Sequence, residues 1–125
     1  MYDLFKDQPY CLIAQPKPFD EYMEETAQCK FVISPEGDMH DCYRHWEALH
    51  VGSIPVVHRS PLDPVFDELP IVIVDNYKEV TEEFLNQKYE KMKNEPYNLR
   101  KLYMQYWVDK IYAVRDEFLA TYNKD

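Results

Sequence analysis

The feature that most constrains the fold is a pair of short apolar segments separated by an amphipathic one. Residues 30–34 (KFVIS) and 54–58 (IPVVH) are rich in β-branched side chains, which favour strands. Between them, Cys42, Trp46 and Leu49 fall within about 60° of one another around a helix. Two strands joined through a helix lie parallel in one sheet, because the connection crosses over a face of that sheet. The sequence therefore predicts an α/β fold.

Further apolar runs extend this pattern along the chain. Asp20 and Thr81 are placed to cap two of the expected helices. The elements indicate a small Rossmann-like parallel sheet of about four strands flanked by helices. The expected strands are 10–14, 30–34, 54–58 and 70–75, and the expected helices are 19–29, 41–51, 81–93 and 98–122.

The chain has 125 residues, a length that suits one domain. We expect residues 1–125 to form a single α/β domain, with residues 98–122 as its C-terminal helix. Periodicity gives that helix an apolar stripe, which is expected to be either core or a surface for a partner. The stripe consists of Leu99, Tyr103, Trp107, Ile111, Val114 and Phe118.

Charge and composition exclude some classes of partner. The formal net charge is −9 at pH 7, whereas a sequence-independent nucleic-acid binder needs a field of Lys and Arg, so we expect no nucleic-acid partner. The N-terminal residues hold no apolar run long enough for a signal peptide or an anchor. The default expectation is therefore a cytoplasmic protein without a membrane segment. The three cysteines lack C-x-x-C spacing and are expected to be free, partly buried thiols.

The polar loop that follows residues 30–34 is the candidate site. A strand-to-helix loop lies at the carboxyl edge of a parallel sheet, where ligands bind. Backbone N–H groups at the helix start, near residues 41–43, can face a diphosphate, and Arg44 adds a fixed positive fork. Gly37 either lets the loop approach a ligand closely or only serves a turn.

Several of these residues also have simpler interpretations. Arg44 and Glu47, three residues apart, suit an ordinary surface pair on a helix. A metal site could be built from His40, Asp41, Cys42 and His45, but zinc needs three or four converging ligands and Cys42 belongs to the apolar stripe. Cys42 near a helix start could be a nucleophile, but no Cys/His/Asn order accompanies it. We therefore expect no metal site and a structural role for Cys42.

An ordered series of motifs supports the first interpretation of the loop. The sequence reads KFVISPEG, then Arg44, WEAL, Gly52 and IPVV, followed by LPIVIVDNYKEV. This order resembles the C-terminal, nucleotide-sugar-binding half of GT-B-fold glycosyltransferases, and within them the exostosin-like family. The resemblance covers about residues 30–84, and the last helix agrees only in kind.

The resemblance implies a donor-binding domain of a glycosyltransferase. The donor would be a UDP- or GDP-linked sugar, the acceptor a carbohydrate, and any activity that of a hexosyl- or pentosyltransferase. By the same resemblance, the Glu47 carboxylate accepts hydrogen bonds from the ribose hydroxyls. No cofactor or metal is expected, because such enzymes stabilise the leaving diphosphate with helix dipoles and basic side chains. The expected substrate-binding residues are Glu36, Gly37, His40, Asp41, Arg44 and Glu47.

The sequence also departs from that family. Many retaining members carry a second glutamate eight residues before the ribose-binding one, and this position is Met39. The acceptor-binding half and the first strands of the donor half have no counterpart here. We therefore expect the isolated chain to bind a donor without completing transfer, and to associate with itself or with a second polypeptide.

Two other classes of function remain open. A non-enzymatic α/β interaction or assembly module would bind no nucleotide and would present a large apolar contact surface. A complete small hydrolase would use the Asp and His residues of the loop, but the sequence has neither a nucleophile elbow nor a set of ligands with metal spacing. A nucleotide titration separates the donor-binding domain from the assembly module.

Overall fold

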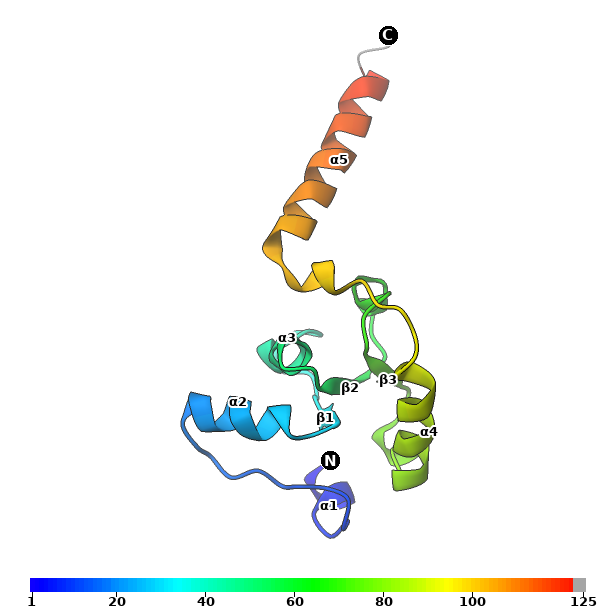
Figure 1. The fold of residues 1–125 in the computed structure, drawn as a ribbon. Coiled ribbons are helices and arrows are strands. Elements are labelled where there is room, and N and C mark those ends of the chain that lie inside the picture. The colour runs from blue at the N-terminus through cyan, green and yellow to red at the C-terminus, as the bar shows by residue number, and fades with distance from the viewer. Residues whose placement is uncertain (123–125) are drawn as a thin grey trace.

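The computed structural model describes residues 1–122, so the last three residues of the expected domain 1–125 lie outside the described part. Its centre is a parallel sheet of three strands in the order β1 (Phe31–Ile33), β2 (Ile54–His58) and β3 (Val72–Val74) (Figure 1). The expected α/β class and parallel sheet are confirmed.

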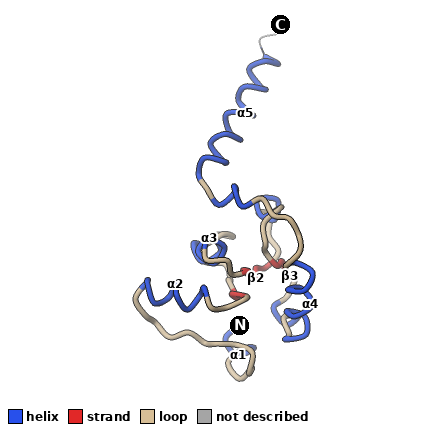
Figure 2. The backbone as a smooth tube through the Cα atoms, in the orientation of Figure 1, coloured by secondary structure: helices blue, strands red, loops and turns tan. Residues whose placement is uncertain are grey.

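Helices cover both faces of this sheet, with α2 and α3 on one side and α4 on the other (Figure 2). The α-helices are α1 (Tyr2–Phe5), α2 (Phe19–Ala27), α3 (Tyr43–His50), α4 (Glu82–Met92) and α5 (Met104–Tyr122), and the 3-10 helices are η1 (Asp63–Phe66), η2 (Tyr77–Glu79) and η3 (Leu99–Leu102).

The central strand β2 is buried on both of its faces. Ile54 and Val56 belong to a core cluster that also holds Met92 of α4. Pro55 and Val57 alternate with them, so their side chains point to the opposite face, which α3 covers. Burial on both faces is typical of a central parallel strand and explains the continuous apolar sequence.

The expected strand at 10–14 is wrong: these residues form no strand and pair with no other. Their side chains still contribute to the core, because Cys11 and Ile13 pack against the cluster of buried residues. The Tyr10 hydroxyl donates to the Val80 carbonyl at 3.3 Å. The apolar run was therefore a correct indication of burial, but the prolines around it favour irregular backbone. The described sheet has three strands rather than four.

Two helix ends follow from local chemistry, and one does not. The Thr81 hydroxyl accepts a hydrogen bond from the Phe84 N–H, so the expected cap of α4 is confirmed. Gly52 follows Val51, the C-terminal cap of α3, and adopts a φ of +83°, a conformation that glycine tolerates best. Asp20 does not cap α2, because the helix already begins at Phe19 with Pro18 at its cap position.

Helix α3 faces the sheet differently from the expectation. Its buried residues are His45, Ala48 and Leu49, whereas Trp46 is half-buried with its ring 6.1 Å from that of Phe66. The expected stripe consisted of Cys42, Trp46 and Leu49, and the buried face is rotated from it toward His45 and Ala48. A buried imidazole therefore lies on the face toward the sheet, at a position that the expected stripe did not include.

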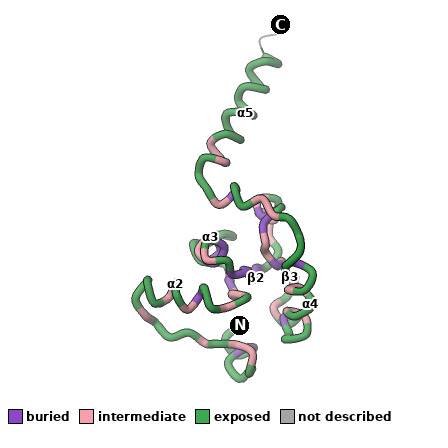
Figure 3. Tube along the Cα trace, viewed as in Figure 1, coloured by how far each residue is buried: buried purple, intermediate pink, exposed green. Residues whose placement is uncertain are grey.

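Helix α5 projects away from the rest of the molecule (Figure 3), and every residue from 109 to 122 is exposed. The expected C-terminal helix is confirmed, but it begins at Met104 rather than at residue 98, and residues 99–102 form the separate turn η3. Its apolar stripe is not part of the core. Among the described helices, none is both long enough and apolar enough to cross a membrane.

Candidate functional site

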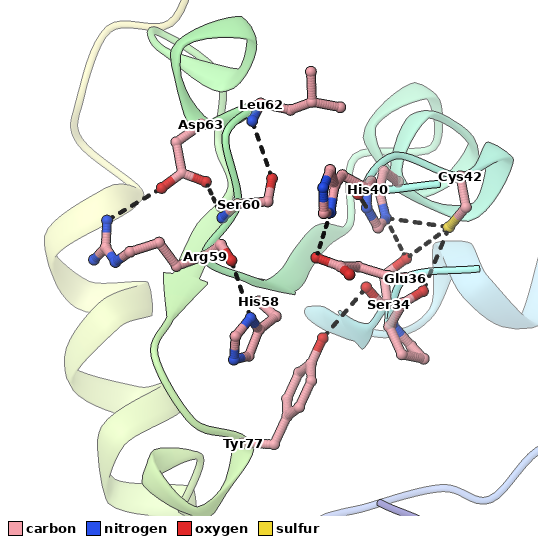
Figure 4. A network of polar contacts seen from close by, with 12 residues as sticks. Ser34, Glu36, His40, Cys42, His58, Arg59, Ser60, Leu62, Asp63 and Tyr77 are labelled. Carbon is pink, nitrogen blue, oxygen red and sulfur yellow. Dashed lines mark hydrogen bonds and ion pairs between the residues drawn. The ribbon is translucent and has the colours of Figure 1, made fainter. Parts of the chain in front are cut away.

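The carboxyl ends of the three strands lead into the polar segments of the site. Ser34 follows β1 and begins the loop to α3, while Arg59 follows β2 and Asp75 follows β3. Because parallel strands end at one edge, these segments lie side by side there (Figure 4). This edge therefore holds the loop that the sequence predicted as a ligand site.

The two ends of the β1–α3 loop are joined through a buried histidine. The Ser34 Oγ lies 2.6 Å from His45 Nδ1, and both residues are fully buried. The Cys42 Sγ lies 3.4 Å from the same nitrogen and 3.7 Å from Ser34 Oγ. With Nδ1 accepting from Ser34, the proton of the neutral ring is on Nε2, which faces the His40 carbonyl at 3.4 Å. One imidazole thus contacts both ends of the loop and its middle.

Burial sets the charge state of this imidazole. Desolvation lowers the pKa of His45 below its ordinary value, and the hydrogen bond to the His40 carbonyl and the nearby Asp41 only partly oppose the effect. The neutral ring matches the contacts described above, in which one nitrogen accepts and the other donates. His45 is therefore a structural support of the loop rather than an exposed ligand.

The middle of the loop is exposed and polar. Residues 36–40 are all exposed, and His40 Nδ1 lies 3.2 Å from the Glu36 Oε1 (Figure 4). A Cβ placed on Gly37 meets nothing within 4 Å, and this glycine does not adopt a positive φ. A turn therefore does not require glycine at this position, and the space outside it is open.

The N-terminus of α3 is open to a ligand. Cys42 occupies the cap position, but its side chain makes no capping hydrogen bond, and the first turn contains no acidic residue. The thiol instead lies near the Ser34 hydroxyl, the Pro35 carbonyl and His45. The first N–H groups of α3 therefore keep the partial positive charge of a helix start.

Arg44 lies in that first turn and is exposed. Within residues 1–122 its guanidinium makes no ion pair and no side-chain hydrogen bond. Asp41 precedes the helix and is exposed as well. The positive fork of Arg44 is therefore available to an anion from outside.

Glu47 is half-buried and faces α2. The Tyr22 hydroxyl donates a 3.0 Å hydrogen bond to Glu47 Oε2. Desolvation and this carboxylate raise the pKa of Tyr22, so the phenol keeps its proton and remains a donor. The bond fixes the orientation of the carboxylate, and Glu47 does not pair with Arg44, contrary to the simple surface-pair interpretation.

The structure adds neighbours that the sequence reasoning missed. The Tyr77 side chain is half-buried and points toward the Ser34 carbonyl, with its hydroxyl 3.5 Å from that oxygen (Figure 4). The Tyr77 and His58 rings lie 6.2 Å apart. His58 ends one predicted strand and Tyr77 follows another by two residues. That position was the one available indication that they lie beside the candidate site.

Arg59, which follows β2 at this edge, is held by two carboxylates. Its Nε donates to Asp75 Oδ1 at 2.5 Å, and its Nη1 donates to Asp63 Oδ2 at 3.1 Å. Because its charge is balanced by these partners, Arg59 is less available to an anion than Arg44 is.

The six expected site residues do not share one enclosed pocket. Glu36, Gly37, His40 and Asp41 are exposed in the loop or beside it, Arg44 is exposed on α3, and Glu47 lies one turn further along that helix. A hollow of about 300 Å³ lies elsewhere, between α1 and η2, and none of the six lines it. Within the described residues, no three His, Cys, Asp or Glu side chains converge as metal ligands would. The candidate site is an open surface at the sheet edge.

Fold and site together define a small parallel α/β domain with a ligand-accessible loop at its carboxyl edge. The family model of the RXYLT1 C-terminal domain matches residues 11–64, which include β1, the loop, α3 and β2. No curated protein matches the sequence significantly. The matched segment, less than half of the chain, relates this domain to glycosyltransferases.

Proposed function

We propose that this domain binds the nucleoside-diphosphate sugar of a glycosyltransferase, in the manner of the C-terminal half of a GT-B fold. The observation that carries the proposal is the open N-terminus of α3 beside Arg44, which has no partner among residues 1–122. The family match supports it, because the matched residues include this loop and helix.

The proposal assigns a role to each part of the site. The first N–H groups of α3 and the Arg44 guanidinium bind the diphosphate. Glu47, oriented by Tyr22, accepts hydrogen bonds from the ribose hydroxyls. Gly37 allows the loop to approach the ligand, and Glu36, His40 and Asp41 contact the sugar or the phosphates from the loop.

The role in transfer follows from what this site offers. The helix N-terminus and Arg44 stabilise the negative charge that develops on a leaving diphosphate. The sugar moves to a carbohydrate acceptor, and we propose that the acceptor surface is supplied by a further polypeptide or by a second copy. The isolated chain then binds donor with little turnover.

The test is a titration of the chain with UDP and with GDP, followed by NMR. Chemical-shift changes should cluster at residues 36–47, and Arg44→Gln should weaken binding by about tenfold, because a charge-assisted contact is lost. Arg100→Gln, on the exposed part of η3, is the matched control and should leave affinity unchanged. Absence of shifts near Arg44 at millimolar nucleotide would remove the proposal.

A second candidate, a non-enzymatic assembly module, is favoured by one observation, the exposed apolar face of α5. It predicts association through α5 with no response to nucleotide. The same titration separates the two, because only donor binding perturbs the loop and the start of α3.

A further inference from the structure

The helix α5 leaves a continuous apolar face uncovered. Met104, Ile111, Val114 and Phe118 have exposed fractions of 77%, 65%, 61% and 64%. Most helical stability in proteins comes from packing of the apolar face, yet every residue of α5 from 109 to 122 is exposed. This face therefore requires a partner surface.

The spacing of the face specifies what kind of surface fits. Together with Trp107, its side chains are separated by three, four, three and four residues, which is the a/d spacing of a two-helix coiled coil. At 100° per residue they occupy a stripe about 80° wide, a narrow seam rather than a broad face. A second helix with the same seam is the complementary partner. The seam consists of Met104, Trp107, Ile111, Val114 and Phe118.

The charges beside the seam select the orientation of that partner. Lys110 and Glu117 lie on one flank, seven residues apart, and Arg115 lies on the other. In a parallel pair of identical helices, Lys110 would face Arg115 of the second copy, and the two would repel. In an antiparallel pair, Lys110 faces Glu117 of the second copy, and the two-fold axis repeats this attraction.

The apolar layers agree with the same orientation. The antiparallel register that places Ile111 against Val114 of the second copy also places Phe118 against Trp107. Trp107 is half-buried at the base of α5, where its Nε1 donates to the Lys101 carbonyl at 2.9 Å. The Phe118 ring, near the C-terminal end of one α5, thus meets the fixed Trp107 ring near the N-terminal end of the other.

We propose that α5 pairs with α5 of a second copy of this chain as an antiparallel two-helix coiled coil. The two sheets then lie at opposite ends of the paired helices, because each α5 projects away from its own body (Figure 1). The pairing does not involve the loop at the sheet edge and does not depend on nucleotide binding.

Sedimentation of the chain over a concentration series tests the pairing. The unaltered chain should form a dimer, and the double variant Ile111→Asp/Phe118→Asp should remain a monomer. Ala113→Asp adds the same side chain on the opposite side of α5 and should still dimerise. Circular dichroism on each variant establishes that the sheet domain is folded. An unaltered chain that stays monomeric at every concentration overturns the proposal and leaves α5 to a different occupant.

Charge exchange tests the orientation. Lys110→Glu and Glu117→Lys should each weaken dimerisation by roughly five- to tenfold, since two attractions become two repulsions. The double variant Lys110→Glu/Glu117→Lys should restore it. If Lys110→Glu instead strengthens the dimer, the introduced carboxylate faces Arg115 of the second copy, the helices are parallel and the proposal is wrong.

Discussion

The Ser34 hydroxyl lies 2.6 Å from Nδ1 of His45, although the two residues are 11 positions apart and belong to a strand end and a helix. This contact closes the β1–α3 loop over a buried imidazole whose other nitrogen faces the His40 carbonyl. The conformation of the candidate ligand loop therefore depends on a polar contact beneath it.

Acidification should weaken the fold through His45. Burial lowers the pKa of His45 in the folded state below its ordinary value of about 6.5. Well above pH 6.5 the ring is neutral in both the folded and the unfolded state, so the contribution of His45 to the free energy of unfolding is at its full value there. Below it the unfolded chain binds a proton that the folded chain does not, and the free energy of unfolding falls. Urea unfolding from pH 7.5 to 5.5 measures this decline.

The variant His45→Asn isolates the contribution of that ring. It should lower the free energy of unfolding at pH 7.5 by about 1–3 kcal/mol, because the His40 carbonyl loses its donor. It should also flatten the decline in stability toward pH 5.5. An equally steep decline in the variant would mean that His45 does not control it.

Removing one hydroxyl tests the orientation of Glu47. Tyr22→Phe deletes the donor to Glu47 Oε2 and should cost about 0.5–1.5 kcal/mol of stability. If Glu47 binds ribose, the same variant should weaken UDP or GDP binding several-fold, because the carboxylate is no longer held in place. Calorimetric titration of the folded variant is the measurement, and unchanged affinity would place Glu47 outside the site.

Filling the open space beside the loop should affect binding alone. Gly37→Val should leave the melting temperature nearly unchanged, because no atom lies within 4 Å of the added Cβ and the residue has no positive φ. Nucleotide affinity should fall markedly if the ligand occupies that space. Gly52→Val is the contrasting variant and should lower stability by roughly 1 kcal/mol or more, since Gly52 adopts a φ of +83°.

The face that α3 turns toward the sheet predicts different losses of stability for Trp46 and Leu49, two apolar residues of this helix. Leu49 is 5% exposed, so Leu49→Ala should cost about 2–5 kcal/mol. Trp46 is only half-buried, and Trp46→Ala should cost less than the loss expected for a fully buried tryptophan. Denaturant unfolding of both variants is the measurement, and a loss of about 3–5 kcal/mol for Trp46→Ala would mean that the expected face, with Trp46 fully buried, is correct.

The sequence was sufficient for elements whose local chemistry and burial agree. The strands β1, β2 and β3 coincide with β-branched runs, and the Thr81 cap lies where a helix start was expected. The run at 10–14 was wrongly predicted to be a strand, because apolar side chains indicate burial but not the hydrogen bonding of the backbone. Its backbone lies outside the sheet even though Cys11 and Ile13 contact the core.

The site was harder to predict because its geometry depends on tertiary contacts. On a helical wheel, Trp46 is a better candidate for the buried face than His45. His45 is nevertheless the fully buried residue, because Ser34 and the His40 carbonyl satisfy its ring nitrogens. The positions of Arg44 and Glu47 on one helix followed from spacing. That Glu47 pairs with Tyr22, and not with Arg44, depends on the placement of α2, which the spacing does not contain.

The order of the strands has a consequence for how the chain acquires its structure. The three strands lie in the sheet in the order in which they occur in the sequence. Each strand therefore adds to the edge left by the one before it, and no later segment has to insert between two that are already paired. The sheet can grow in step with synthesis from the ribosome, with α3 laid over β1 and β2 before β3 has emerged.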